Sequence, residues 1–290
     1  MKRLVCLCLL PLMLTGCGSE GFADRTYTRA IGLHGALQMC VQGFEQEGCT
    51  VTDAGSIGEA LQFEEAAAGG RIFTGHTELL CVDGSGVGDA VEALFLEQGI
   101  SPGCKVLYTR PVAYLQQHDA AETVHSLRMA ERSGLLPRTE LATVLEEWLG
   151  VGQTALVPVE GCRKLVLLRQ DGKTTALSEQ ACEGMRYLRH APAVTNVTLD
   201  DGTEIGIDRI RLRKTAEDGT VRFTVKLRVR NASPSQCSAL HEKLRQACEM
   251  AVREMHTARA DVIGVQEICE SHGIPADPLP EVQVRVEVQQ

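Results

Sequence analysis

The feature that most constrains the fold of this chain is a strict alternation near its C-terminus. Across 221–229, valine, phenylalanine and leucine occupy every second position, and arginine, threonine and lysine stand between them. A period of two predicts a strand with one buried and one solvated face, which is typical of an antiparallel sheet. Valines at alternate positions in 282–288 predict a closing strand. The C-terminal part is therefore expected to form a sheet with a single apolar face.

A long helix is predicted between these strands, over 235–257, followed by a shorter one over 260–270. The apolar stripe of the long helix consists of Leu240, Leu244, Cys248, Ala251 and Met255, and its other face is charged. The stripe predicts that this helix covers the apolar face of the sheet. Upstream, the apolar alternation in 205–212 changes phase at Asp208 and Arg209, which indicates a β-bulge.

The first part of the chain alternates strand and helix patterns, which favours an α/β or α+β domain. Strands are predicted in 27–39, 72–82, 105–108, 154–159 and 163–169, and helices in 56–68, 88–98, 178–188 and, with a break at 134–137, 120–150. We predict an α+β fold of several mixed α/β domains that ends in an antiparallel sheet covered by a long helix. The expected domains are an N-terminal α/β region over 25–160, either undivided or with a helical subdomain at about 120–150, and a C-terminal domain over 161–290.

The N-terminus has the pattern of a lipoprotein signal. Lys2 and Arg3 precede an apolar run that ends at Leu14. This run of about eleven residues is short of the roughly twenty that a membrane-spanning helix needs, so we predict a signal peptide over 1–16 that is removed.

The residues around the predicted cleavage site match a lipobox. Leu14 is the branched apolar residue, Thr15 and Gly16 are the small residues that the signal peptidase recognises, and Cys17 would become the lipidated N-terminus. An ordinary secretory signal with an incidental cysteine is the alternative. Two acyl chains suffice for stable attachment, so diacylglyceryl-Cys17 is expected to hold the chain on a membrane through a tether over 17–24.

Charge and cysteine content exclude several kinds of partner and site. The formal net charge is −9, and loss of the signal peptide makes it more negative, so nucleic acid is not expected as a partner. Nine of the twelve cysteines would remain after processing and lipidation, none of them in a C-x-x-C motif. This pattern supports neither a zinc ribbon nor a disulfide framework. Most of these cysteines are expected to be small buried side chains.

No catalytic or metal site is predicted. His76-Thr77-Glu78 is similar to the H-x-E of zinc deaminases, but no P-C-x-x-C supplies the remaining ligands, so a structural His76 is favoured. The glycine-rich segment 84–88 lacks the third glycine of a dinucleotide loop and the lysine of a P-loop, which favours a simple turn. His118 and His125 are expected on the surface. We predict no cofactor.

Basic residues gather on two neighbouring predicted strands of this acidic chain. They are Arg209, Arg211, Arg213, Arg222, Lys226, Arg228 and Arg230. One interpretation is a solvated sheet face balanced by nearby acids. The other is a candidate docking face that meets an acidic partner or an anionic membrane.

Several segments, in order, resemble one family. They are the lipobox, Gly75-His76-Thr77-Glu78-Leu79-Leu80, the stretch from Gly152 to Pro158, Leu177-Ser178-Glu179 leading to Gly184, and Ala260-Asp261-Val262-Ile263-Gly264-Val265 after the late strand and long helix. Together they look like the Ger(x)C spore germination lipoproteins, the C subunits of germinant receptors. The resemblance implies several mixed α/β domains, a lipid anchor on the outer face of the spore inner membrane, and two polytopic membrane subunits as partners. It implies no enzymatic activity.

Two functions are therefore expected as alternatives. The first is a non-enzymatic, lipid-anchored receptor subunit that takes part in nutrient-triggered spore germination. The second is a surface lipoprotein that binds or processes a small molecule, which would require a pocket with convergent polar groups. The sequence alone displays no such pocket.

Overall fold

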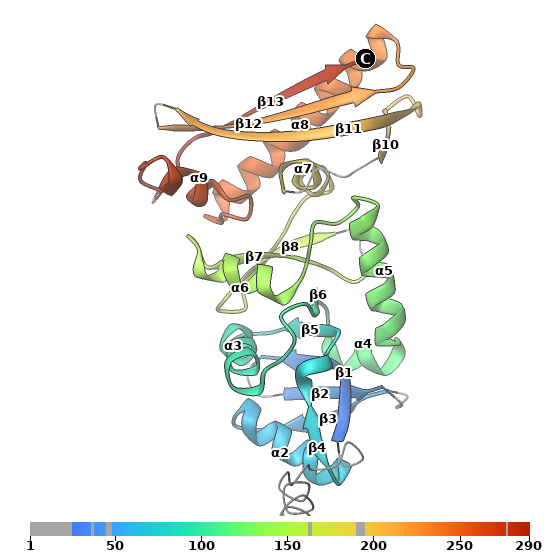
Figure 1. Cartoon of the computed structure of the whole chain (residues 1–290), viewed down its shortest axis with the longest axis vertical. Helices are drawn as coiled ribbons and strands as arrows, with labels where there is room; N and C mark the ends of the chain where they lie inside the picture. The colour runs from blue at the N-terminus through green and yellow to red at the C-terminus, as the bar shows by residue number, and fades with distance from the viewer. Residues whose placement is uncertain are drawn as a thin grey trace, which may run out of the picture.

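The computed structural model describes residues 25–35, 38–44, 48–161, 164–189, 195–217, 219–276 and 278–290. Three sheets follow one another along the long axis of the molecule, with the N-terminal sheet at the lower end and the C-terminal sheet at the upper end (Figure 1). The predicted α+β class is confirmed. The signal peptide and the tether, with Leu14, Thr15, Gly16 and Cys17, lie outside the described residues.

The N-terminal sheet has the order β3-β2-β1-β5-β6, with β4 also paired to β1. Its strands are β1 (Arg25–His34), β2 (Gln38–Gly43), β3 (Thr50–Asp53), β4 (Arg71–Phe73), β5 (Leu79–Asp83) and β6 (Lys105–Tyr108). β1, β5 and β6 run parallel, so their carboxyl ends lie at one edge of the sheet.

Helices cover both faces of this sheet. They are α2 (Ile57–Ala68), α3 (Val87–Gln98), α4 (Pro111–Gln117) and α5 (Ala120–Arg132), together with the short 3-10 turn η2 (Thr74–His76). Alternate residues of each strand point to opposite faces. Ile31 and Leu80 accordingly belong to the core under α2 and α3, and Ala30 and Cys81 to the core under α4 and α5.

The predicted strand over 27–39 is wrong in one respect, because two strands occupy that region. β1 ends at His34 and β2 begins at Gln38, and the two pair antiparallel. Gly35 has a φ of 60° between them, a backbone conformation that glycine adopts without the strain of a side chain. The apolar alternation continues across the turn and therefore hides it.

The middle sheet is small and antiparallel. It consists of β7 (Thr154–Pro158), β8 (Leu165–Arg169) and β9 (Thr174–Ala176), and α6 (Leu141–Leu149) packs against it. Trp148 of α6 is buried, and its Nε1 donates a hydrogen bond of 2.9 Å to the carbonyl of Leu168. A parallel bridge between Tyr108 and Val159 joins this sheet to β6. The boundary expected between 160 and 161 falls in the turn of the β7–β8 hairpin.

The C-terminal sheet has the order β10-β11-β12-β13. Its strands are β10 (Thr195–Thr198), β11 (Glu204–Glu217), β12 (Thr220–Val229) and β13 (Val282–Gln289), and its helices are α7 (Glu179–Arg189), α8 (Pro234–Thr257) and α9 (Val265–Ser271). The register shift between Ile207 and Arg209 confirms the predicted bulge. The five predicted stripe residues of α8 are all fully buried.

One strand of this sheet differs from the expected antiparallel arrangement. β13 pairs with β12 in parallel, with Val221 beside Val282 and Leu227 beside Val288. The connection between them contains α8, whose 24 residues carry the chain back along the sheet before β13 begins. Parallel neighbours need a long crossover of this kind, usually a helix.

The start of α8 provides a testable contribution to stability. Ser233 accepts a hydrogen bond from the backbone of Gln236, whose side chain bonds back to the backbone N–H of Ser233, a complete capping box. We expect Ser233→Ala to lower the free energy of unfolding by about 1 kcal/mol, because one backbone donor loses its partner. Ser238→Ala is the control, since the Ser238 hydroxyl only donates to the Pro234 carbonyl inside the helix. Urea unfolding measures both, and equal effects would contradict the capping role.

Candidate functional site

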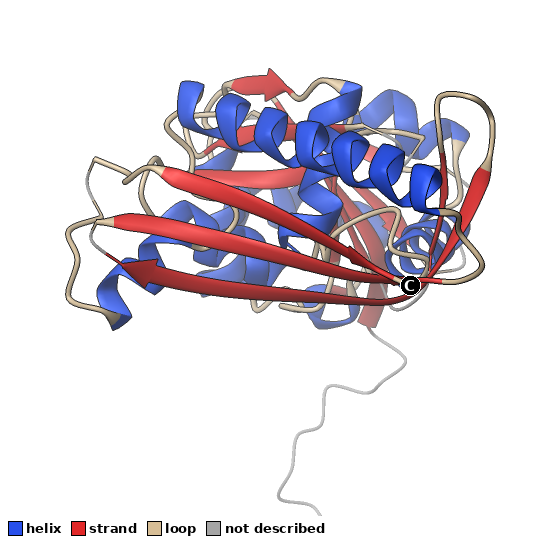
Figure 2. Cartoon of the chain, turned by 90° about the horizontal axis from the view of Figure 1, so that it is seen from above, coloured by secondary structure: helices blue, strands red, loops and turns tan. Residues whose placement is uncertain are grey.

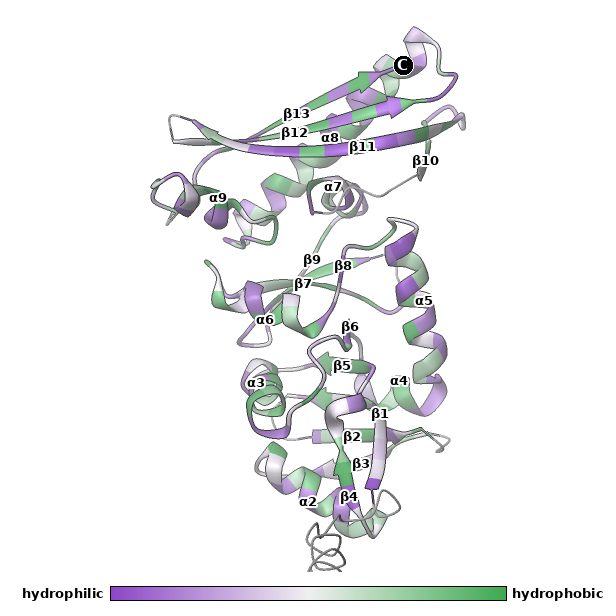
Figure 3. Ribbon diagram, in the orientation of Figure 1, coloured by the Kyte–Doolittle hydropathy of each residue, from purple (hydrophilic) through white to green (hydrophobic). Residues whose placement is uncertain are grey.

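The predicted basic residues lie on one face of the C-terminal sheet. The register of β11 and β12 sets Arg209 opposite Arg228 and Arg211 opposite Lys226. Arg213 lies opposite Thr224 and Arg222 opposite Thr215 on the same face, and Arg230 follows the end of β12. Figure 3 shows hydrophilic and hydrophobic residues alternating along both strands. We call these seven residues the basic face.

The alternation of β12 explains how the basic face is formed. Val221, Phe223, Val225, Leu227 and Val229 are buried on the inner side, where the stripe of α8 belongs to the same core. The residues between them must then point to the other side of the sheet. Lys214 of β11 lies on the inner side, where its Nζ donates a 2.6 Å hydrogen bond to the carbonyl of Ile263. Burial lowers the pKa of Lys214.

Acidic neighbours neutralise a minority of the basic face. Lys226 forms an ion pair of 2.8 Å with Glu287 of β13, and Arg230 pairs with Asp208. These partners hold the pKa values of Glu287 and Asp208 below their ordinary values. Arg285, which the sequence interpretation missed, lies opposite Thr224 on this face and also pairs with Glu287, at 3.1 Å. Arg285 stands between two valines of the alternation in β13, and this position was the sequence signal that it lies on the solvated face.

Five arginines of the basic face have no ion-pair partner within 4 Å in the part of the chain that the structure describes. They are Arg209, Arg211, Arg213, Arg222 and Arg228, and all five are exposed. Seen from above, the three long strands of the sheet lie uncovered, with the long helix beside and behind them (Figure 2). The structure therefore brings the predicted residues together on one accessible surface with excess positive charge.

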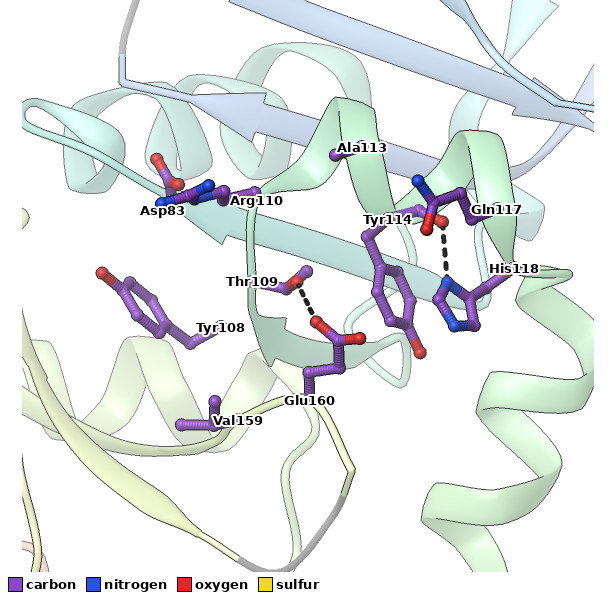
Figure 4. A pocket seen from close by; sticks show the side chains of 10 residues that line it. All are labelled: Asp83, Tyr108, Thr109, Arg110, Ala113, Tyr114, Gln117, His118, Val159 and Glu160. Carbon is purple, nitrogen blue, oxygen red and sulfur yellow. Dashed lines mark hydrogen bonds between the residues drawn. The ribbon is translucent and has the colours of Figure 1, made fainter.

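A second candidate site lies at the carboxyl ends of β5 and β6. It is an open pocket of about 440 Å³, lined by Asp83, Tyr108, Thr109, Arg110, Ala113, Tyr114, Gln117, His118, Val159 and Glu160 (Figure 4). Ligands of α/β sheets commonly bind at this edge. Sequence reasoning missed this site and named only His118 of its lining, as a surface residue, although Asp83 and Arg110 each follow the core of a predicted strand.

Polar groups inside this pocket are already partly paired. His34 Nδ1 donates to the Asp83 carboxylate, and Thr109 Oγ1 donates a 3.3 Å hydrogen bond to Glu160. The ring of His118 stacks on Tyr114 with centroids 4.3 Å apart. Arg110 is exposed at the rim. The pocket thus combines a cation, two carboxylates and aromatic walls, the convergent polar groups that the sequence alone did not reveal.

The glycine-rich segment 84–88 forms a turn, as predicted, and its N–H groups are used inside the protein. Gly86 N donates to the carbonyl of Asp171 at 3.4 Å, and Gly88 N to that of Gln170 at 3.2 Å. A Cβ on Gly88 would lie 2.3 Å from the Gln170 oxygen. The turn between β8 and β9 therefore covers the N-terminus of α3, where a phosphate would otherwise bind.

The histidines singled out from the sequence have structural surroundings. His76 lies in η2, where its ring is 5.2 Å from that of Phe73 and 5.7 Å from that of Tyr27. His118 and His125 are exposed, as predicted. Within the described residues, no group of three or more His, Cys, Asp or Glu side chains is arranged to hold a metal ion.

Cysteines occupy mainly the core, as expected. Six are buried, namely Cys40, Cys81, Cys104, Cys182, Cys248 and Cys269, while Cys49 and Cys237 are half-buried and Cys162 lies outside the described residues. All eight described cysteines are free thiols. Burial raises the pKa of Cys104 and of Cys248 to about 12, so both stay protonated and unreactive at neutral pH.

The segments singled out by the family resemblance include close contacts between distant parts of the chain and one local helix cap. A Cβ on Gly152 would lie 1.9 Å from the carbonyl oxygen of Arg259, and one on Gly184 would lie 2.1 Å from that of Ala247. Asp261 accepts hydrogen bonds from two N–H groups at the start of α9. The backbone of Glu78 bonds to β1 on one side and to Lys105 on the other. The contact of Gly152 thus joins the middle sheet to the C-terminal domain, whereas the other contacts lie within one domain.

Comparison with known proteins gives one structural match. No family model matches the chain, and no curated protein does. A match among solved structures is titled "Crystal Structure of the GerBC protein"; it covers 87% of this chain and 93% of that one, with a TM-score of 0.48 and 10% sequence identity. Among the described helices, none combines the length and apolar character needed to cross a bilayer.

Proposed function

We propose that this chain is the lipid-anchored, non-enzymatic C subunit of a spore germinant receptor. Cys17 carries the lipid on the outer face of the spore inner membrane, and the folded domains assemble with two polytopic membrane subunits in nutrient-triggered germination. The observation that carries the proposal is that two glycines in segments resembling Ger(x)C lipoproteins lie at close backbone contacts of the fold, Gly152 against Arg259 and Gly184 against Ala247. The contact of Gly152 brings the middle sheet close to the C-terminal domain, and a close contact between domains suits a scaffold.

The mechanism of such a subunit is positioning. A lipid anchor confines the protein to the membrane plane, where weak contacts with neighbouring subunits occur at a high effective concentration. The three sheets that follow one another along the long axis then present surfaces at different distances from that membrane. The basic face is one such surface, and it carries positive charge on a chain whose net charge is −9.

Replacing Cys17 by alanine tests the anchor and its role together. Wild type grown with labelled palmitate should carry the label and sediment with membranes, whereas Cys17→Ala should be unlabelled and remain in the supernatant. Nutrient-triggered germination of the variant spores should slow roughly tenfold or more, because tethering supplies the effective concentration. Full germination without the label would contradict the proposed role of the anchor.

Small-molecule binding at the pocket beside β5 and β6 is the second candidate function. The convergence of Asp83, Arg110 and Glu160 on one cavity favours it. Thermal unfolding in the presence of each free amino acid and sugar would test it, with Arg110→Ala as the variant that removes the rim cation. A ligand-dependent rise in melting temperature that disappears in the variant would support binding, and no shift with any compound would oppose it.

A further inference from the structure

We propose that the basic face binds a carboxylate-rich surface of another protein, on the side of the molecule that points away from its membrane. This inference deepens the proposed function and rests on the anchor at Cys17 for its direction. It commits to a protein partner, whereas the sequence left an acidic partner and an anionic membrane as alternatives.

The charge arrangement of the face calls for an external anion. Arg209 lies directly opposite Arg228, and Arg211 directly opposite Lys226. Like charges at facing cross-strand positions destabilise a sheet. Only Lys226 of these four has an ion-pair partner among the described residues, namely Glu287. Carboxylates placed over the sheet would remove this repulsion.

The position of the face argues against the membrane that holds the anchor. β4 and the start of β1, the first described strand, lie at the lower end of the long axis, and the C-terminal sheet lies at the upper end (Figure 1). The tether over 17–24 would join the chain at that lower end. The basic face is therefore at the far end from the lipid, where proteins rather than the headgroups of the same leaflet would meet it.

The kind of anion follows from residue type and net charge. Six of the seven basic residues are arginines, whose planar guanidinium group binds a carboxylate through two parallel hydrogen bonds. Phosphate polymers bind arginine as well, but a long polyanion would extend beyond this one face. The chain as a whole has a net charge of −9, so its other surfaces would repel the part of the polyanion that extends beyond the basic face. A protein patch of limited size avoids that repulsion.

A peptide-binding experiment tests the proposal with the complete lipidated protein. The protein is reconstituted in phosphatidylcholine vesicles, and binding of a fluorescent glutamate-rich peptide is measured by anisotropy at low salt. Arg211→Glu with Arg228→Glu should raise the Kd at least about tenfold, since like charges then face the peptide. The matched control is Arg132→Glu with Arg138→Glu, exposed arginines at and after the end of α5, which changes net charge equally and should alter the Kd less than about twofold.

The remaining arms separate the competing occupants. Replacing phosphatidylcholine by phosphatidylglycerol around the anchor should leave peptide binding unchanged. The proposal would be overturned by loss of peptide binding in those vesicles, by preference for polyphosphate over the peptide, or by self-association through the basic face. Equal weakening of peptide binding in both double variants would overturn it as well. If the anchor proposal fails instead, the protein does not stay on vesicles, while peptide binding still depends on Arg211 and Arg228.

Discussion

Arg189→Ala is expected to lower the free energy of unfolding by about 1–2 kcal/mol at pH 8, because it leaves a buried carboxylate without its partner. Arg189, at the end of α7, pairs with Glu147 of α6, and both side chains are nearly buried. Glu147 also accepts a 2.8 Å hydrogen bond from the backbone of Leu156. This pair joins the C-terminal helices to the middle sheet.

The effect of Arg189→Ala should depend on pH. Burial raises the pKa of Glu147 from 4.5 to about 7, although Arg189 lowers it. The folded chain therefore keeps this proton where the unfolded chain has lost it. The stability that results is complete below pH 4.5 and is lost as the pH rises through 7. Without Arg189 the pKa of Glu147 rises further, so the penalty should be small below pH 7 and grow above it.

Urea unfolding followed by the fluorescence of Trp148, the single tryptophan and the neighbour of Glu147, measures this effect. Arg245→Ala is the matched control, because Arg245 pairs with Glu242 and Glu249 on the exposed face of α8. Surface pairs of this kind contribute about 0–1 kcal/mol. A penalty for Arg189→Ala that is no larger than the control, or that is the same at pH 6 and pH 8, would contradict a buried ion pair at this joint.

Gly184→Ala should lower the free energy of unfolding by about 3 kcal/mol, at the upper end of the range for overpacked cores. A Cβ at this position would lie 2.1 Å from the carbonyl oxygen of Ala247 and 2.9 Å from the Cα of Cys248. These are backbone atoms of α8 and cannot rotate away. The two helices must separate, and the core between α7 and the C-terminal sheet must open with them.

Gly58→Ala separates this steric effect from the general effect of adding a methyl group to a helix. No atom lies within 4 Å of a Cβ built on Gly58 in α2, so this variant should gain roughly 0.5–1 kcal/mol from better helix propensity. Thermal and urea unfolding of the two variants should shift in opposite directions. A stabilised Gly184→Ala would mean that α7 and α8 do not meet as closely as described.

Elements with a clear period could be predicted from the sequence. The stripe of α8 and the alternation of β12 each repeat over many residues, so their type and buried face followed directly. The hairpin of β1 and β2 was missed because its turn at Gly35 leaves the alternation intact. The direction of β13 could not be read from its valines, since alternation is the same in parallel and antiparallel strands and only the crossover decides.

The two candidate sites also differ in how far the sequence could predict them. The basic face lies on two neighbouring strands of one hairpin, so the spacing of its arginines was enough to predict it. The pocket at Asp83, Arg110 and Glu160 depends on the pairing of β5 with β6 and on the docking of the β7–β8 hairpin. Such contacts between distant segments have no local pattern. Cys17 has a strong local pattern, but it lies outside the described residues.

The central claim is best tested by purification of the tagged protein from detergent-solubilised spore inner membranes, with mass spectrometry of the chains that accompany it. Wild type is expected to bring down two polytopic membrane subunits, and Cys17→Ala to lose them because it leaves the membrane. Recovery of the protein alone, or its presence only in membranes of vegetative cells, would contradict the assignment as a germinant receptor subunit.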